Sequence, residues 1–355
     1  MNTQTDLPPV VSLYPDRQIR VRGSEDKLTV FLDTTAHLEI ALCPVSPDTL
    51  HATLSYLHQG FEQHALFAAL EAVFTGRPSL KSLTLSSPAS ALIAPLVADG
   101  LLREAGQERF TCTAEALWQY PNLWLNKAAF GVPPQPFVIT NGRRHPLRPT
   151  ASSNVLYSRH IPWLGQTFTL READPDRDLH AFNRWMNNPR VAQFWEEDGS
   201  LEQHHAYLQK QLDDPHTLPL IGHFDGQPFG YFEVYWAKED RIAPFYDAGD
   251  YDRGLHLLVG EETFRGKAFY TAWFSSLCHY MFLDDPRTQR LVCEPRHDNH
   301  RQIANFDRNG FAKVKHFDFP HKRALLVMLA RERFFSERLY QPLGSIDLSK
   351  EGTTV

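Results

Sequence analysis

The sequence predicts an α/β protein of two domains, each built around a mixed β-sheet. The chain has 355 residues, a length that usually corresponds to two domains of about 150 residues each. Short alternating apolar segments and longer helical segments follow one another on both sides of residues 132–162, which are rich in Pro, Gly, Ser and Arg. We therefore expect an N-terminal α/β domain, a linker, a second α/β domain and a C-terminal tail at residues 1–131, 132–162, 163–340 and 341–355.

Composition argues against several classes of function. The 36 Lys and Arg residues and 42 Asp and Glu residues give a net charge of −6, which disfavours nucleic acid or an anionic membrane as the main partner. The cysteines Cys43, Cys112, Cys278 and Cys293 are far apart, so neither a zinc site nor a disulfide scaffold is indicated. Residues 1–16 do not resemble a secretory signal, and no apolar stretch approaches about eighteen residues. We expect a cytoplasmic protein that uses no metal.

The first 131 residues predict the element order β-β-β-α-β-α-β. Alternating apolar residues between turn residues predict strands at residues 18–22, 27–33, 37–43, 79–86 and 109–113. Helical spacing predicts helices at residues 61–74 and 88–102. Gly76 and Pro78 end the first helix, and Pro88 begins the second.

The residues after the linker predict the order β-α-α-β-β-β-α-β-α-β-β. Strands are expected at residues 167–171, 218–224, 229–235, 254–260, 291–294, 312–317 and 323–328. Helices are expected at residues 179–187, 201–212, 266–282 and 299–309. Ser200 with Gln203 predicts a helix N-cap, Asp225-Gly226 a hairpin turn, and Gly310 the end of a helix.

This second order resembles the GNAT acyltransferase fold. A strand, then Arg265-Gly266-Lys267-Ala268, then a long helix is similar to the pyrophosphate loop of that family, although Ala268 and Tyr270 stand where its common motif has glycines. Backbone N–H groups at a helix start bind phosphate well, and small residues let the backbone approach closely. The resemblance implies an acyl-coenzyme A co-substrate bound by Leu257, Leu258, Val259, Arg265, Gly266, Lys267, Ala268, Phe269, Tyr270 and Asn299.

A closer resemblance is to the acyltransferases of hydroxamate siderophore biosynthesis, especially the aerobactin hydroxylysine acetyltransferase subfamily. It is carried by residues 184–200, 219–242, 251–266, 283–301 and 315–328, which include RWMNNPRVAQFWEEDGS and LDDPRTQRLVCEPRHDNHR. The resemblance implies transfer of an acyl group, acetyl by expectation, from acyl-coenzyme A to the hydroxylated nitrogen of lysine, ornithine or a diamine. The product would be a hydroxamate for iron acquisition. The first 150 residues match weakly, and their element order suggests a degenerate GNAT-like half.

His256 is the candidate catalytic base. In GLHLLVG it faces away from Leu255, Leu257 and Val259, and a hydroxylamine that is neutral near pH 7 needs only an acceptor for the proton it loses during attack. A structural strand histidine is the alternative, and the resemblance favours the catalytic role. Asp298 is the expected partner that orients the imidazole, with helix capping as its alternative. For Asn299 the alternative role is again helix capping. For Arg265 and Lys267 the alternative is that they simply belong to an exposed basic loop.

Residues that could bind the acceptor are aromatic or charged. They are Trp185, Trp195, Glu233, Tyr235, Trp236, Arg241 and His321. Each aromatic residue has a place in the core as its alternative, Glu233 has an exposed ion pair, and His321 has a structural role in anchoring its loop. Asp240 is a further candidate for binding a distal ammonium, and Arg241 or Arg253 could bind the carboxylate of a succinyl donor.

Three alternatives stay open at this point: succinyl-coenzyme A as donor, an ordinary amine as acceptor, and a non-catalytic coenzyme A-binding subunit. A homodimer is also left open.

Overall fold

A computed structural model describes residues 5–7, 19–88, 90–126, 134–149 and 155–342. The chain divides into two compact units, residues 1–125 with 158–167, and residues 126–157 with 168–355. Each unit is described below by itself. No helix within the described ranges is long and apolar enough to cross a membrane.

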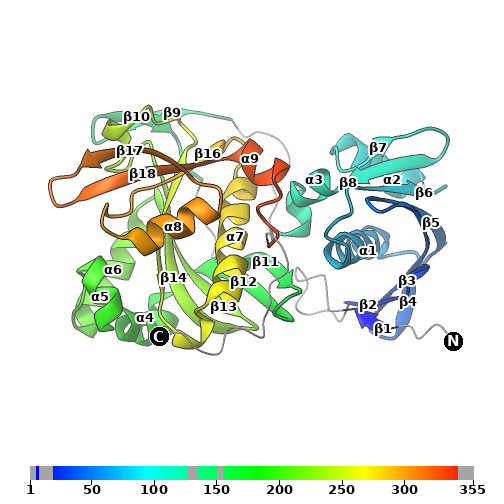
Figure 1. The fold of residues 1–355 in the computed structure, drawn as a ribbon, viewed down its shortest axis with the longest axis horizontal. Coiled ribbons are helices and arrows are strands. Elements are labelled where there is room, and N and C mark those ends of the chain that lie inside the picture. The colour runs from blue at the N-terminus through cyan, green and yellow to red at the C-terminus, as the bar shows by residue number, and fades with distance from the viewer. Residues whose placement is uncertain (1–4, 8–18, 89, 127–133, 150–154, 343–355) are drawn as a thin grey trace. The chain divides into compact units, whose positions relative to one another are not determined.

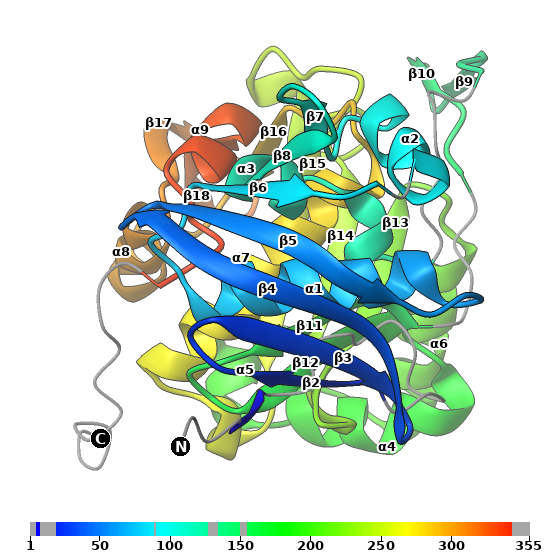
Figure 2. The ribbon, with the colours of Figure 1, turned by 90° about the vertical axis from the view of Figure 1, so that its right-hand side faces the viewer.

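The first unit is a mixed sheet with its main helix on one face. Over the described residues the strand order is β1-β2-β3-β4-β5-β6-β8-β7. Its strands are β1 (Thr5–Leu7), β2 (Ile19–Gly23), β3 (Lys27–Leu32), β4 (Thr35–Ser46), β5 (Thr49–Leu57), β6 (Ser82–Ser86), β7 (Arg103–Glu104) and β8 (Arg109–Thr113). Its helices are α1 (Glu62–Gly76), α2 (Ser90–Ala98) and α3 (Ala114–Trp118). The ribbon shows α1 behind β3 and β4 (Figure 2).

The core of the first unit lies between α1 and the sheet. Leu38, Ile40 and Leu50 are buried on the strands, and residues 65–74 of α1 are buried without a break. The expected strands and helices of this half are present, with shifted ends. Strand β5 was missed, although Leu50, Ala52, Leu54 and Tyr56 alternate with polar residues as expected of a strand.

A second mixed sheet, of order β11-β12-β13-β14-β15-β16-β18-β17 over the described residues, belongs to the second unit except for residues 158–167, which group with the first unit. Its strands are β11 (Val155–Ile161), β12 (Gln166–Glu172), β13 (Thr217–Phe224), β14 (Gln227–Trp236), β15 (Arg253–Val259), β16 (Arg290–Cys293), β17 (Ala312–Asp318) and β18 (Arg323–Ala330). Its helices are α4 (Pro175–Met186), α5 (Pro189–Trp195), α6 (Leu201–Asp213), α7 (Lys267–Asp284), α8 (His300–Arg308) and α9 (Arg331–Ser336). Figure 1 labels these elements except β15, which is labelled in Figure 2.

Helices cover both faces of the second sheet. On one face, Phe182, Trp185 and Leu208 from α4 and α6 pack against Tyr231 and Leu258 of the sheet. On the other face, Trp273 of α7 contacts the rings of Phe229 and Phe232 on β14. Strand β15 lies between these two layers, and its side chains therefore point alternately toward one layer and the other. This arrangement agrees with the GNAT topology that the sequence predicts.

The region predicted as a linker, residues 132–162, is structured where it is described. Strands β9 (Phe137–Thr140) and β10 (Arg143–Pro146) form a hairpin, and β11 is an edge strand of the second sheet. The linker prediction did not anticipate these strands, because the prolines and arginines in and around them give the segment the composition of a loop. Of the predicted tail, residues 343–355 lie outside the described part of the chain.

Candidate active site

The candidate active site lies where two neighbouring parallel strands separate. Strands β15 and β16 pair through Arg253 with Leu291 and Gly254 with Val292. Past this point β15 continues to Val259 alongside β14, while the chain after β16 pairs toward β18. A cleft of about 1580 Å³ is lined by residues 255–259 on one side and 293–296 on the other.

His256 lies inside this cleft between two carboxylates. Its Nδ1 atom is 2.9 Å from Glu233 Oε2, and its Nε2 atom is 3.0 Å from Glu294 Oε1. The register explains both contacts, since Glu233 is directly opposite His256 on β14 and Glu294 follows the end of β16. The imidazole keeps 27% of its side-chain surface exposed, so it can also meet a ligand in the cleft.

The two carboxylates favour a charged imidazole. Burial lowers the pKa of His256, but its hydrogen bonds to Glu233 and Glu294 raise it more, to about 10. Burial raises the pKa of Glu294, and the hydrogen bond and charge of His256 lower it to about 2. At neutral pH the group is therefore an imidazolium held by two anionic carboxylates, and its protons belong to the group as a whole.

Three tyrosines complete the hydrogen bonding of the carboxylates. The hydroxyl groups of Tyr207 and Tyr231 donate to Glu233 Oε1 at 2.6 and 3.1 Å. The hydroxyl of Tyr235 donates to Glu294 Oε2 at 2.9 Å. Gly254 makes room for this contact, because a Cβ atom there would lie 2.2 Å from the Tyr235 ring. The tyrosines thus fix the two carboxylates from two elements, α6 and β14.

The end of β15 and the start of α7 form the basic end of the cleft. Gly266 takes a φ of +104° and precedes the first turn of α7, where Lys267 stands and no acidic residue occurs. Arg190, Arg265 and Arg301 gather here from α5, the loop and α8, and burial and the charges of Arg265 and Arg301 are among the causes that lower the pKa of Arg190. A helix N-terminus with three guanidinium groups is suited to binding a phosphorylated ligand.

Most of the predicted ligand-binding residues line this cleft. They are Trp195, Glu233, Tyr235, Arg241, His256, Leu257, Leu258, Val259, Arg265, Gly266, Lys267, Tyr270 and Asn299. Asn299 also caps α8, because its side chain accepts a hydrogen bond from the Gln302 N–H group. The two readings of Asn299 are therefore compatible in this structure.

Asp298 is not the partner of His256. Its carboxylate accepts hydrogen bonds from Arg296 Nε and Nη2 at 3.1 and 3.0 Å, and its side chain is about half exposed. Glu233 and Glu294 take both imidazole nitrogens instead. The prediction was based on the position of Asp298 near the end of the strand. The residue that strand register places beside His256 is Glu294, four positions earlier in the sequence.

Several other predicted site residues belong to the core or the surface. Trp185 is buried in the layer of α4 to α6 and donates from Nε1 to Glu261. Trp236 lies between the guanidinium groups of Arg148 and Arg253. Those that do not line the cleft are Trp185, Trp236, Ala268, Phe269, Asp298 and His321. Phe269 packs on Phe224 and Phe264, Ala268 is buried, and His321 is exposed and stacks on Phe319. Arg253 is also buried, with its guanidinium on Asp284.

Sequence reasoning missed several charged and tyrosine residues that line the cleft. They are Arg190, Tyr207, Glu294, Arg301 and Lys322. Glu294 could have been found from the sequence. It follows the strand that pairs with the strand of His256, and strand register brings the two side chains together. Tyr207 had no such signal, because it reaches Glu233 from a helix that precedes the sheet residue by 26 positions.

Comparison with known proteins places this architecture in a family. Residues 174–319 match the family model described as the acetyltransferase (GNAT) domain. The Escherichia coli N(6)-hydroxylysine O-acetyltransferase is 44% identical over 225 residues, which cover 62% of this chain and 70% of that protein. The Beauveria bassiana N(5)-hydroxyornithine:cis-anhydromevalonyl coenzyme A-N(5)-transacylase SIDF is 46% identical over 215 residues, 59% of this chain and 47% of that protein.

Among solved structures, an uncharacterized protein from Bacillus halodurans is 28% identical with a TM-score of 0.49, covering 51% of this chain and 93% of that one. The sequence matches to the family model and to the two relatives show the family. By those matches, the chain belongs to the GNAT acetyltransferase family.

Proposed function

We propose that this protein transfers an acyl group from acyl-coenzyme A to the nitrogen of an N-hydroxylated amine and so forms a hydroxamate for siderophore biosynthesis. The observation that carries the proposal is the Glu233–His256–Glu294 group in the cleft between the separated strands. The names of the Escherichia coli and Beauveria bassiana relatives, which concern hydroxylysine and hydroxyornithine, support this acceptor class.

The donor fits the basic end of the cleft. Arg190, Arg265, Arg301 and the first turn of α7 would bind the phosphates of coenzyme A. Its pantetheine arm would extend along β15 toward His256, a distance of three residues or about 10 Å from Val259. The thioester would then lie beside the imidazolium.

The reaction follows from these positions. The acceptor nitrogen attacks the thioester carbonyl, the C–N bond forms and the C–S bond breaks. The proton lost by the nitrogen passes to the Glu233–His256–Glu294 group, and this group returns one proton to the departing sulfur, which leaves as the free thiol. The imidazolium also stabilises the negative charge that develops on the carbonyl oxygen.

The protonation state of this group favours a hydroxylamine over an alkylamine. An alkylammonium group has a pKa near about 10.4 and must lose a proton before it can attack. With His256 protonated and the pKa of Glu294 at about 2, the group contains no strong free base at neutral pH. A hydroxylamine is already neutral there and only has to release a proton as the bond forms.

Product analysis tests the proposal. Acetyl-coenzyme A is incubated with N6-hydroxylysine, N5-hydroxyornithine, N-hydroxycadaverine and the matched unhydroxylated amines, and free thiol and product are measured. We expect at least one hydroxylated acceptor to be used more than about tenfold faster than its matched amine, with a product that forms a coloured iron(III) complex, since a hydroxamate chelates iron through two oxygens. Preferred acylation of the matched amines, or a product acylated on oxygen that forms no such complex, would contradict the proposal.

A succinyl donor is tested in the same assay. Arg241 lines the cleft with half of its side chain exposed, near Glu294. Arg253 does not serve this purpose, because it is buried against Asp284. If succinyl-coenzyme A is used faster than acetyl-coenzyme A, and Arg241→Ala removes that advantage, the donor assignment changes while the acceptor assignment stays.

A further inference from the structure

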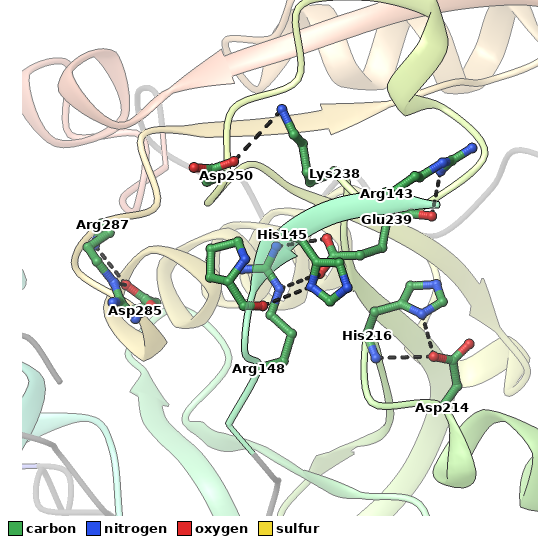
Figure 3. A network of polar contacts seen from close by, with 11 residues as sticks. Arg143, His145, Arg148, Asp214, His216, Lys238, Glu239, Asp250, Asp285 and Arg287 are labelled. Atoms are coloured by element: carbon green, nitrogen blue, oxygen red, sulfur yellow. Dashed lines mark hydrogen bonds and ion pairs between the residues drawn. The ribbon is translucent and has the colours of Figure 1, made fainter. Parts of the chain in front are cut away.

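The hairpin β9–β10 and the residue Arg148 that follows it bind the loop between β14 and β15. Arg148 donates from Nε and Nη2 to both oxygens of Glu239, at 2.5 and 2.7 Å, and His145 Nδ1 lies 2.8 Å from Glu239 Oε1. Arg143 donates to the backbone carbonyls of Glu239 and Asp240. Figure 3 shows these three side chains converging on Glu239. A segment about 90 residues earlier in the chain thus fixes this loop.

The contact is buried and bidentate. The side chains of Arg148 and Glu239 are 2% and 7% exposed. The guanidinium of Arg148 also lies 4.2 Å from the centroid of the Trp236 ring. A buried bidentate pair is directional, and removing one partner leaves the other charge uncompensated. The hairpin therefore holds the start of the loop in one position.

The loop between β14 and β15 places charged residues in the cleft, at the end opposite its basic end. It joins β14 to β15 just after Trp236, at the opposite end of β15 from α7. Asp240 and Arg241, the next residues after Glu239, both line the cleft. Arg241 Nη2 is 3.8 Å from Glu294 Oε1, and the charges of Glu294 and His256 act on the carboxyl of Asp240. These residues therefore stand beside the reactive group, where an acceptor would approach.

We propose that the β9–β10 hairpin, through Arg143, His145 and Arg148 on Glu239, positions Asp240 and Arg241 to bind the charged end of the acceptor remote from its hydroxylamine. This inference rests on the proposed function. It makes Arg148 and Glu239 positioning residues, which act through the loop and do not touch the acceptor. The hairpin then sets which acceptors fit without taking part in donor binding.

The variant Arg148→Met tests this role in the full-length protein. Removing the guanidinium frees Glu239 and loosens the loop, so we expect the KM for the hydroxylated acceptor to rise about tenfold or more, with the KM for acetyl-coenzyme A unchanged. Arg148→Lys keeps one of the two hydrogen bonds and is expected to restore part of the loss. Arg143→Ala, which loses only the contacts to the two carbonyls, is expected to raise the same KM less strongly and serves if Arg148→Met does not fold.

Arg287→Met is the matched control. Arg287 makes a similar bidentate contact with Asp285, also drawn in Figure 3, but neither residue lines the cleft. We expect its acceptor KM to equal that of the parent protein. An acceptor KM that is unchanged in Arg148→Met and Arg143→Ala, in a parent protein that acylates hydroxylamines, would overturn this inference alone. A parent protein that acylates no hydroxylamine would instead overturn the proposed function.

Discussion

The two sheets of the molecule pair their strands in the same way, yet differ at the junction on which the site depends. In each, an antiparallel run leads to a parallel pair, β5 with β6 and β15 with β16, followed by two further antiparallel strands. Strands β5 and β6 stay paired through Thr49–Thr53 and Ser82–Ser86, whereas β15 and β16 pair at two positions. In the first sheet, backbone hydrogen bonds therefore hold β5 and β6 together. In the second sheet, β15 and β16 separate over the corresponding stretch and form the cleft.

The helix that connects the two strands of the parallel pair differs in charge at its start. Helix α7 follows Gly266 and begins with Lys267. Helix α1 follows Phe61 and begins with Glu62, a carboxylate in the first turn. A carboxylate there occupies the position where a phosphate would bind and repels it, so the same topology becomes unsuited to a phosphorylated ligand.

A histidine occurs on the central strand in both sheets. His256 lies between two carboxylates, while Nε2 of His51 on β5 lies 2.9 Å from the Ser86 hydroxyl. We propose that the first unit is a GNAT-like half without a coenzyme site. The topology supplies only the frame, and strand separation, a basic helix start and paired carboxylates would supply the chemistry of the proposed transfer.

The largest effect is expected from breaking the carboxylate–histidine group. Replacing His256 by Ala removes the proton carrier, so we expect kcat for acyl transfer to fall by roughly 10² or more, with the Kd for coenzyme A nearly unchanged. His51→Ala is the matched control in the first sheet and should leave kcat within about twofold. Steady-state kinetics and calorimetric titration measure both values. A kcat near that of the parent protein in His256→Ala would remove the histidine from the mechanism.

An intermediate effect is expected at the basic end of the cleft. Arg265→Ala and Arg301→Ala each remove a charge close to the α7 N-terminus, so the Kd for coenzyme A should rise about tenfold in titrations at fixed salt. Arg323→Ala is the control, since Arg323 is exposed on β18 and does not line the cleft. Equal affinities in all three variants would place the phosphates elsewhere.

The smallest effect concerns stability as a function of pH. His256 has its pKa raised to about 10, so its contribution is full below about 6.5, its ordinary value, and is lost as the pH rises through 10. The free energy of unfolding, measured with urea, should therefore fall between pH 7 and pH 10. In Glu294→Gln this fall should be shallower, because the imidazolium has lost one carboxylate, and in His51→Ala it should be as steep as in the parent protein. A Glu294→Gln curve parallel to that of the parent would contradict the pairing.

Much of this frame could be predicted from the sequence, because long amphipathic helices and alternating strands carry strong local signals. The β14–β15 strands and α7 are examples, and the resemblance in residues 184–328 identified the family. The β9–β10 hairpin was missed although Asn141-Gly142, both with positive φ, is a hairpin signal, because prolines on either side suggested a loop.

The partners within the site were less predictable. Asp298 was chosen for its position in the chain, and Glu294 is the residue that strand register brings to the imidazole. The raised pKa of His256 depends on two carboxylates that come from different strands, and Arg148 reaches Glu239 across 91 positions. Contacts between residues so far apart in the sequence are determined by tertiary packing, which local sequence patterns do not reveal.

Hydrogen exchange of the full-length protein with and without acetyl-coenzyme A tests most directly where the acyl donor binds. If the thioester enters the gap beside His256, amide protection should increase in residues 254–270 and 293–302 and stay unchanged in residues 49–64 of the first sheet. Protection confined to residues 49–64, with none around the imidazole, would contradict the account.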